Sequence, residues 1–442
     1  MILFISNSGE SLPIAHRIQQ AGHEVAVYLH NPKYRDNFGD LVKRLTPAKL
    51  PGAVRRAEAV VFDILRPNEG THADKQLLKV FRANQKAPEV FGAVAAKIRN
   101  KVLTIGASPE TATWELDRDK GTAIAKEVGI QIPETHNFTT LSDGAAFLKG
   151  KTGRWVFKPH NNQDLDLTYM ESYPGELKSK LEGEYKARLG NRFGFLLQQV
   201  VEGVEISTEG WFDGKRFTAF NHTLEDKKLM NGNLGPAIGS QGNTVWVKRD
   251  PHGLLVQELG KLAPKLRAAG YIGPIDVNCI VAEADHKPHF LEWTCRQGYD
   301  ALFCLLTLLQ GGIADWYLRR FQAPLASGFA SSQRITIPPF PYAEPNLLSE
   351  YAQGVALENG LDLDHFWPQD VRQRDGQLEC AGADGIIGIT AAKGGSVGES
   401  VGTMYRSINK LRVASTLQYR TDGGRRAEKD RKQLHKWGVN ID

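Results

Sequence analysis

The chain has 442 residues, which is too long for one ordinary hydrophobic core, so we expect two to four domains or lobes. Hydrophobic residues make up 41% and charged residues 24%, as in an ordinary soluble globular protein, and no run of 18 apolar residues exists that could span a membrane. The formal net charge of +5 permits an anionic ligand, but it is too small for this length to require nucleic acid.

The four cysteines form no CxxC pair, which argues against a structural zinc site and against a disulfide framework. The first residues, MILFISNSGES, have no basic region and turn polar after five residues. They are predicted to form a buried strand and not a signal peptide. We therefore expect a cytoplasmic protein with no membrane partner.

The first hundred residues alternate short apolar runs with helical patterns. This rhythm predicts a small parallel α/β domain over residues 1–103. The turn after the first strand, SNSGES, lies between a strand and a helix. Backbone N–H groups at such a helix start can hold a phosphate, although a plain strand–helix turn is an equally good interpretation.

Residues 104–325 combine helices with strands whose patterns suggest pairing, at RWVFKPH, GFLLQQVV and EISTEGWFDGKRFTAF. The segment RRFQAPLASGFASSQR, residues 319–334, is rich in Ala, Ser and Gly and is predicted to link this region to a last domain over 326–442. That domain should contain a helix whose apolar stripe is formed by Val401, Met404, Tyr405, Ile408 and Leu411.

The tail over residues 425–436, RRAEKDRKQLHK, is basic. A solvated terminal helix is the simpler interpretation, and a contact with nucleic acid is the alternative. We expect no nucleic-acid partner.

Two apolar runs near residue 280 are interrupted by polar residues at every second position. This alternation predicts two half-buried strands joined by a turn at AEADHKP and centred near Ala284. In that register Asp276 faces Glu292, and Thr294 and Arg296 share their face. Mg²⁺ bound jointly with phosphates would neutralise the two carboxylates. A solvated sheet face with Arg296 pairing one carboxylate is the alternative, and a one-residue slip would separate the set.

Other polar residues sit at positions where a nucleotide could bind. Lys158 ends an apolar strand in WVFKPH, where burial of a lysine is costly without an anionic partner. The run LLQQVVEGVE could form an extended linker whose backbone contacts a purine edge, with Glu205 on the ribose hydroxyls. Lys120, in DRDKG, opens a helix where a phosphate could sit. Each feature alone also fits an ordinary strand, turn or surface lysine.

Taken in this order, the segments resemble the ATP-grasp superfamily, and more closely the phosphoribosylamine–glycine ligase family, over nearly the whole chain. The segments that carry the resemblance are LFISNSGESLPIAHRI, IGASPETATWELDRDKGTAIAKEVGIQIPET, WVFKP, QQVVEGVEISTEGWFDGKRF, LEDKKLMNGNLGPAIGSQG, FLEWTCRQG and ADGIIGITAAKGGSVGESVGTMYRSINKLR. The resemblance implies an ATP-grasp fold, of α/β and α+β class. An N-terminal parallel α/β (Rossmann-like) domain would precede the ATP-grasp domain over 104–325, which includes a small lid lobe at about 120–195. A mixed β/α domain would end the chain.

The resemblance also implies an ATP-dependent ligase that joins a carboxylate to an amine through an acyl phosphate, using ATP and Mg²⁺, which Mn²⁺ could replace. The expected substrates are an amino acid such as glycine and a phosphorylated amine, as in purine biosynthesis, and the protein would be a monomer or a homodimer. The residues implied for ATP are Lys120, Lys158, Gln199, Val201 and Glu205. Those implied for the metal are Asp276, Glu292 and Thr294. Those implied for catalysis and the substrates are Arg296, Lys158, Ser8, Gly9, Lys228, Gly235 and Pro236.

The chain departs from the family pattern at several places. HNNQDLDLTY follows Lys158 where the family has a glycine-rich phosphate loop, and Thr294 stands where an Asn is usual. The substrate segment has NGN where an acidic residue is usual, and PPFPYAEP replaces a Gly-Tyr-Pro turn. Two alternatives therefore stay open: a ligase for another amine, such as a modified nucleobase or an amino sugar, and an inactive scaffold that binds nucleotide or nucleic acid.

Overall fold

The computed structural model describes residues 1–160, 167–248, 250–358 and 364–442. Most of the glycine-free segment predicted to replace the phosphate loop, residues 161–166, lies outside the described residues. The chain divides into two compact units. Unit 1 contains residues 1–112, 206–276 and 294–442, and unit 2 contains residues 113–205 and 277–293. The domain boundaries at residues 103 and 325 stay a prediction, because the first and last regions of the chain share unit 1.

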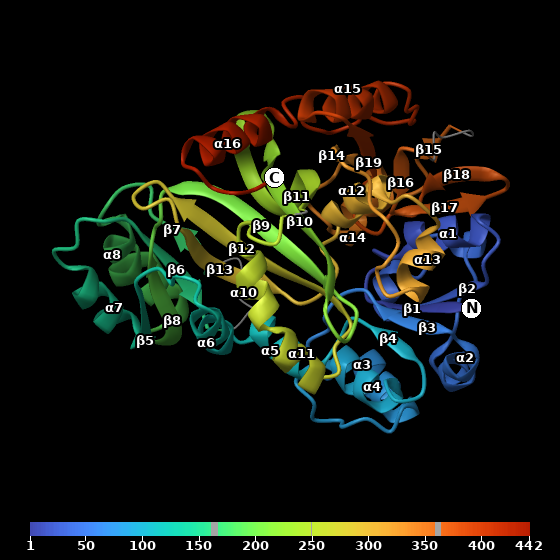
Figure 1. Cartoon of the computed structure of the whole chain (residues 1–442), viewed down its shortest axis with the longest axis horizontal. Helices are drawn as coiled ribbons and strands as arrows, with labels where there is room; N and C mark the ends of the chain where they lie inside the picture. Colours follow the sequence, from blue (N-terminus) through green and yellow to red (C-terminus); the bar gives the residue numbers. More distant parts are fainter. Residues whose placement is uncertain (161–166, 249, 359–363) are drawn as a thin grey trace. The chain divides into compact units, whose positions relative to one another are not determined.

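Unit 1 begins with a parallel sheet of four strands in the order β2-β1-β3-β4 (Figure 1). The strands are β1 (Ile2–Ser6), β2 (Val25–Leu29), β3 (Ala59–Phe62) and β4 (Leu103–Ile105). The helices between them are α1 (Leu12–Gln20), α2 (Leu50–Arg56), α3 (His72–Val80) and α4 (Val90–Ile98), with short 3-10 turns at Pro32–Tyr34, Gly39–Leu41 and Pro47–Lys49. These elements confirm the predicted parallel α/β region.

The first strand explains how this sheet is covered on both faces. Successive side chains of a strand point to opposite faces, so Leu3 and Ile5 of β1 pack in one core with α2, α3 and α4. Ile2 and Phe4 pack in a second core, together with α1. Both faces are therefore buried, which is why β1 has the continuous apolar sequence ILFIS.

A larger sheet has eight strands in the order β13-β12-β9-β10-β11-β14-β19-β16. The strands are β9 (Gly203–Phe212), β10 (Phe217–Met230), β11 (Leu234–Lys248), β12 (Gly273–Ala282), β13 (Pro288–Thr294), β14 (Phe329–Thr336), β16 (Phe366–Pro368) and β19 (Ile386–Gly394). Strands β9, β12 and β13 each contain a boundary between the units.

The other elements of unit 1 follow the same pattern of short strands and helices. The remaining strands are β15 (Ala356–Leu357), β17 (Val371–Arg374) and β18 (Gln377–Cys380). The helices are α10 (Val256–Lys261), α11 (Ala263–Ala268), α12 (Ala301–Leu308), α13 (Ile313–Leu318), α14 (Pro345–Tyr351), α15 (Val397–Ile408) and α16 (Arg425–Lys436). Helix α5 (Pro109–Leu116) contains the boundary at residue 112.

The predicted helix is confirmed as α15, and the five residues of its predicted stripe belong to or pack against the main core. Leu411 does so from beyond the end of the helix at Ile408. The basic tail forms helix α16, as expected. The four cysteines are buried and free. No helix in the described ranges has the length and apolar character to cross a membrane.

The prediction of a linker over residues 319–334 is wrong in its second half. Residues from Phe329 onward form β14, which pairs with β11 on one side and β19 on the other. The small side chains that suggest a linker are buried here: Ala330, Ser331 and Ser332 are almost fully inaccessible, and Ser331 hydrogen-bonds Ser400 of α15 at 2.8 Å. Small residues let elements pack closely, and composition alone does not distinguish that use from flexibility.

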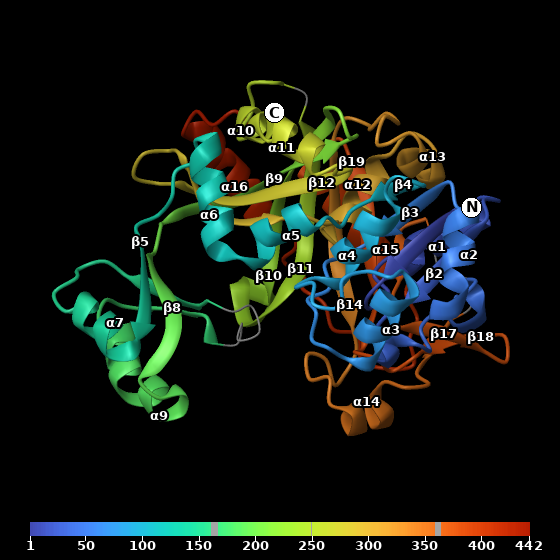
Figure 2. The same ribbon diagram turned by 90° about the horizontal axis from the view of Figure 1, so that it is seen from below.

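Unit 2 contains an antiparallel sheet in the order β5-β8-β6-β7. The strands are β5 (Thr135–Thr140), β6 (Trp155–Pro159), β7 (Tyr169–Met170) and β8 (Arg192–Gln199). The helices are α6 (Arg118–Val128), α7 (Leu141–Leu148), α8 (Glu176–Lys180) and α9 (Lys186–Leu189), with a π-helical turn at Leu181–Tyr185. Figure 2 shows α7 and α9 beside β5 and β8. Phe157 and Phe195 stack at 4.7 Å between ring centroids in this small core.

Candidate active site

The two lysines predicted to bind ATP lie on different elements of unit 2. Lys158 is half-buried near the end of β6, and its Nζ donates a hydrogen bond to Oε1 of Gln198 on the neighbouring strand β8, at 2.7 Å. Lys120 is exposed in the first turn of α6, whose N-cap Asp117 accepts the Lys120 backbone N–H at 3.1 Å. Both side chains therefore stand at element ends, but their contact with ATP stays a prediction.

The segment predicted to bind adenine and ribose connects β8 to β9. Gln199 is exposed at the end of β8, and its backbone N–H donates to the Glu134 carbonyl at 2.8 Å. Val201 lies in the connection between the two strands, and Glu205 is half-buried near the start of β9. A short connection of residues 200–202 joins the two strands, and both its extended conformation and the nucleotide contacts stay predictions.

The polar hairpin is confirmed as β12 and β13. Its turn closes with hydrogen bonds from Ala282 N to Lys287 O at 3.0 Å and from His286 N to Ala282 O at 2.9 Å. The turn therefore spans residues 283–286, at the predicted place. Glu292 is exposed, while its neighbour Trp293 is buried. The facing of Asp276 and Glu292 stays a prediction.

Tryptophan packing links β13 to helix α6 within unit 2. The indole Nε1 of Trp293 donates to the Gly121 carbonyl at 2.9 Å, and the ring lies 6.4 Å from that of Trp114. Gly121 is needed here, since a Cβ would lie 2.4 Å from the Trp114 carbonyl oxygen. The packing brings the start of α6 close to Glu292.

Arg118 is a residue that the sequence did not single out. Burial lowers the pKa of its guanidinium, and the nearby Glu292 carboxylate partly offsets this effect. Its Nε is buried and has no hydrogen-bond partner in the described part of the chain. The Arg118 guanidinium therefore already lies near Glu292, the carboxylate that is predicted to bind the metal.

Asp276 has an acidic neighbour, Glu209, within unit 1. Burial and the charge of Asp276 raise the pKa of Glu209, which accepts a hydrogen bond from Trp211 Nε1 at 3.0 Å. Two carboxyl groups that repel each other form a donor set that suits a hard divalent cation. Within the described ranges, no group of three or more His, Cys, Asp or Glu side chains could hold a metal without other ligands.

The other predicted residues of unit 1 occupy different places. Thr294 and Arg296 are half-buried, and Arg296 Nη1 donates to the Gln297 carbonyl at 3.4 Å. Lys228, Gly235 and Pro236 belong to strands β10 and β11. The predicted substrate loop is thus the end of a long hairpin. Strands β10 and β11 pair in one register from Phe220 with Lys248 to Asp226 with Gly242, and again, after irregularities, at Lys228 with Ala237 and at Met230 with Leu234.

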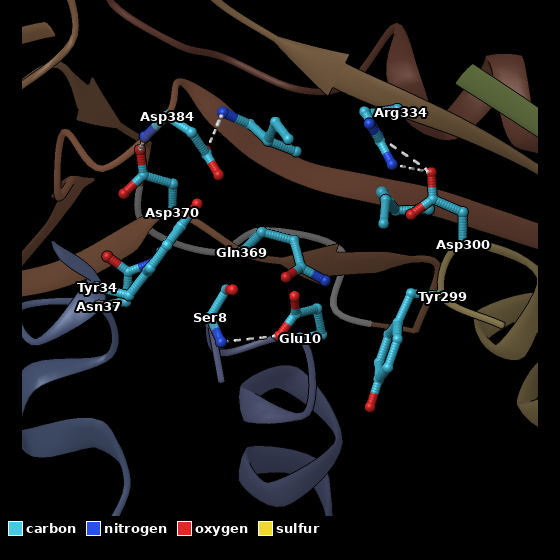
Figure 3. A pocket seen from close by; sticks show the side chains of 12 residues that line it. Ser8, Glu10, Tyr34, Asn37, Tyr299, Asp300, Arg334, Gln369, Asp370 and Asp384 are labelled. Atoms are coloured by element: carbon cyan, nitrogen blue, oxygen red, sulfur yellow. Dashed lines mark hydrogen bonds and ion pairs between the residues drawn. The ribbon is translucent and has the colours of Figure 1, made fainter. Parts of the chain in front are cut away.

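Unit 1 contains a cavity of about 250 Å³ (Figure 3). Ser8, which lies with Gly9 in the turn after β1, is one of the residues that line it. Figure 3 shows Ser8 and Glu10 on one side of the cavity and Asp384 and Arg334 on the other. The described residues that line the cavity are Ser8, Glu10, Tyr34, Asn37, Tyr299, Asp300, Arg334, Gln369, Asp370, Asp384, Ile386 and Ile389. Only Ser8 among them was predicted from the sequence.

The location of this cavity follows a general rule of parallel sheets. The order β2-β1-β3-β4 reverses direction between β1 and β3, and ligands of such sheets bind beyond the carboxyl ends of the strands at that point. The residues after β1 and after β3 meet there: the Asn7 backbone N–H donates to Asp63 Oδ1 at 3.3 Å, and Ser11 Oγ donates to Asp63 Oδ2 at 3.0 Å. Asp63, directly after β3, could have been predicted from this rule.

Comparison with known proteins finds ligases similar in sequence, and ligases and carboxylases similar in fold. No family model matches the sequence. A phosphoribosylamine–glycine ligase of Leptospira interrogans is 22% identical over 330 residues, covering 72% of this chain and 76% of the relative. One from Methanosarcina barkeri is 23% identical over 255 residues, covering 55% of this chain and 53% of the relative.

Two solved structures have the same arrangement of elements. The phosphoribosylamine–glycine ligase of Thermotoga maritima gives a TM-score of 0.68 at 16% identity, covering 96% of this chain and all of that one. The chain has the ATP-grasp fold. A biotin carboxylase of Campylobacter jejuni, in a complex with a β-γ-ATP ligand, gives a TM-score of 0.57 at 12% identity, covering 95% and 92% of the two chains. The predicted fold and the resemblance read from the sequence are confirmed.

Proposed function

We propose that the protein is an ATP-dependent carboxylate–amine ligase that forms an amide through an acyl phosphate. The observation that carries this proposal is the likeness to the Thermotoga ligase over 96% of the chain, together with curated relatives of the same name. The segments that resemble the nucleotide-binding segments of the family form β6, α6, the β8–β9 connection and β13.

The side chains of unit 2 would bind the nucleotide. Lys158 and Lys120 would bind phosphates of ATP as cations, with the Gln198 amide holding the Lys158 ammonium group in place. The backbone at Gln199 and Val201 would contact the adenine edge, and Glu205 would accept hydrogen bonds from the ribose hydroxyls.

Glu292, Asp276 and Thr294 would hold Mg²⁺. The oxygen donors fit this ion, although a hydroxyl is a weaker ligand than the usual amide oxygen. When bound, the ion neutralises the charge of the β- and γ-phosphates. The Arg118 guanidinium lies near Glu292 and would share the carboxylate with the ion.

The reaction would proceed in two displacements. A carboxylate oxygen of the amino acid attacks the γ-phosphorus of ATP, and ADP leaves with the bonding electron pair. The amine nitrogen then attacks the carbonyl carbon of the acyl phosphate, inorganic phosphate leaves, and the amine loses a proton. Arg296 would orient the carboxylate or the phosphoryl group with its planar guanidinium.

Glycine is the carboxylate substrate that the relatives' name suggests, and phosphoribosylamine is the corresponding amine. The segments of the substrate region depart most from the family pattern, so the identity of the amine depends on the residues of this chain's own cavity beside Ser8.

The test is ATP-dependent release of ADP in the presence of glycine and an amine, with mass spectrometry of the amide. Glu292→Gln should abolish ADP release with an unchanged circular dichroism spectrum. Glu283→Gln, which changes an exposed carboxylate in the turn of the same hairpin, is the matched control and should remain active. Full activity of Glu292→Gln would remove the metal assignment, and ATP binding without turnover under any amine would favour an inactive scaffold.

A further inference from the structure

The charged groups that line the cavity beside Ser8 are mostly acidic. Glu10, Asp300, Asp370 and Asp384 contribute four carboxyl groups, and Arg334 is the one cation among the described lining residues. A site for a phosphorylated amine would need cationic groups for the phosphate. The charge of this cavity is of the opposite sign.

Arg334 does not supply that cation, because its guanidinium is already engaged. Its Nε and Nη2 contact Asp300 Oδ2 at 3.0 and 2.8 Å, and its Nη1 donates to the Ile238 carbonyl at 3.1 Å. The Asp300 side chain is almost fully buried, so this ion pair is screened little by water. The pair therefore adds no positive charge to the cavity.

Three backbone N–H groups of the turn after β1 already have acceptors within the protein. In a turn that binds phosphate, such groups would point at the anion. Here Asn7 N donates to Asp63, Ser8 N donates to Glu10 Oε2 at 3.1 Å, and Gly9 N donates to Ser6 Oγ at 2.9 Å. The phosphate contact of Ser8 and Gly9 stays a prediction, and it would require these hydrogen bonds to break.

The cavity instead offers an acceptor that lacks a donor. Asn37 is 4% exposed, and its Oδ1 has no hydrogen-bond partner in the described chain. A buried acceptor without a partner costs free energy that a donating ligand would recover. Asn37 lies on the loop after β2, where its backbone carbonyl accepts from the Arg44 guanidinium, and it lines the cavity with Tyr34.

Two of the carboxyl groups are held in an environment that disfavours their charge. Burial raises the pKa of Glu10, with a further contribution from Asp63. Burial and the charge of Asp370 raise the pKa of Asp384. Asp370 itself is satisfied by the backbone N–H groups of Ala383, Asp384 and Gly385 at 2.9–3.0 Å, so it shapes the loop.

We propose that this cavity binds the amine substrate as a cation without a phosphate group, with Glu10 and Asp384 on the ammonium and Asn37 accepting a further N–H or O–H. The proposal rests on the ligase function proposed above and specifies its amine. A carboxylate whose pKa lies near neutrality is also suited to accept the proton that the ammonium must lose before it attacks a carbonyl carbon. A small amino sugar or amino alcohol has the required chemistry and fits the cavity volume.

Binding without ATP tests the cavity separately from the reaction. Calorimetry of the full chain with glucosamine and ethanolamine is compared with calorimetry with glucosamine 6-phosphate and phosphoethanolamine, the same amines carrying a phosphate. We expect at least one unphosphorylated amine to bind at millimolar concentration and its phosphate to bind about tenfold more weakly or not at all. Equal or tighter binding of the phosphates, or no binding of either unphosphorylated amine, would overturn the proposal.

Variants locate the binding at the acidic groups. Glu10→Gln and Asp384→Asn keep the side-chain shapes and should each weaken binding of the unphosphorylated amine by about tenfold, the scale of one hydrogen bond to a charged group. Asp36→Asn removes an exposed carboxylate from the same loop as Tyr34 and Asn37 and should bind like the parent protein. Unchanged binding in both cavity variants would place the amine elsewhere.

Turnover separates the two proposals. ADP release is measured with glycine and each amine, and with 5-phosphoribosylamine formed from ribose 5-phosphate and ammonia. Release with a phosphorylated amine alone would refute the cationic substrate and leave the ligase function intact. Binding of unphosphorylated amines with no ADP release under any of these amines would refute the ligase function while leaving the cation site in place.

Discussion

Replacement of Asp384 by Asn should make the protein more stable and its amine binding weaker. The Asp384 side chain accepts the Ile386 N–H at 2.9 Å and a hydrogen bond from the Tyr34 hydroxyl. Asn keeps an oxygen for both donors. The substitution therefore removes one negative charge beside Asp370 with little change in shape.

The magnitude follows from the pKa. Burial and Asp370 raise the pKa of Asp384 from 3.8 to about 7, while the charges of Arg334 and Lys33 oppose the rise. Because the folded pKa lies above the unfolded one, the folded protein binds the proton more tightly, and stability is lost as the pH rises from about 4 through 7. Each pH unit corresponds to about 1.4 kcal/mol, so the ionised group costs about 4 kcal/mol above pH 7 and about 3 kcal/mol of this develops between pH 5 and pH 8.

Urea denaturation of the parent protein and of Asp384→Asn at pH 5 and pH 8 measures this difference. We expect the advantage of the variant to grow by about 3 kcal/mol over that interval. Asp36→Asn, at an exposed carboxylate, should show no such growth. If the stability advantage of the variant did not change with pH, the pKa of Asp384 would not be raised in the folded protein. The electrostatic argument for a cation in the cavity would then fail.

Other substitutions test separate parts of the molecule. Lys158→Ala should weaken ATP binding by about 1–3 kcal/mol, the scale of a hydrogen bond to a charged group, and an unchanged affinity by calorimetry would count against the assignment. Gly121→Ala places a Cβ 2.4 Å from the Trp114 carbonyl oxygen, so the thermal midpoint should fall by several degrees, whereas an unchanged midpoint would show that α6 is not packed as described. Asp300→Asn frees the guanidinium of Arg334 and should shift calorimetric preference from glucosamine toward glucosamine 6-phosphate; no shift would mean that this ion pair does not set the charge of the cavity.

Elements with a clear local pattern could be predicted from the sequence. The β12–β13 hairpin lies where alternation and a turn containing Asp and Pro placed it, and the N-terminal strands lie where short apolar runs end at polar residues. Such patterns act over a few residues, so they are visible without knowledge of the rest of the chain. The same reasoning failed at β14, where burial between two strands, not composition, determines the structure.

The cavity could not be predicted in this way, because its described lining comes from six separate segments of the chain. From the sequence alone, Glu10 is an ordinary acidic residue near the start of a helix, and Asn37 is an ordinary loop residue. Their significance depends on which groups tertiary packing places beside them, such as Asp63 beside the β1 turn and Asp384 beside Tyr34. Asp63 alone carried a local signal, since it directly follows a parallel strand.

The acidic cavity and the nucleotide segments suit ligands of opposite charge. The groups assigned to ATP are lysines, backbone N–H groups and a carboxylate suited to Mg²⁺, and each of them also fits the family pattern. The cavity holds several carboxyl groups at a cost in stability, and such a cost persists where it serves binding. If Glu10 and Asp384 had only a structural role, Gln and Asn would stabilise the fold at no loss, and this chain would have no physical reason to keep both charges. A cationic ligand supplies that reason, because it relieves the repulsion and restores the ionised state that its own binding requires.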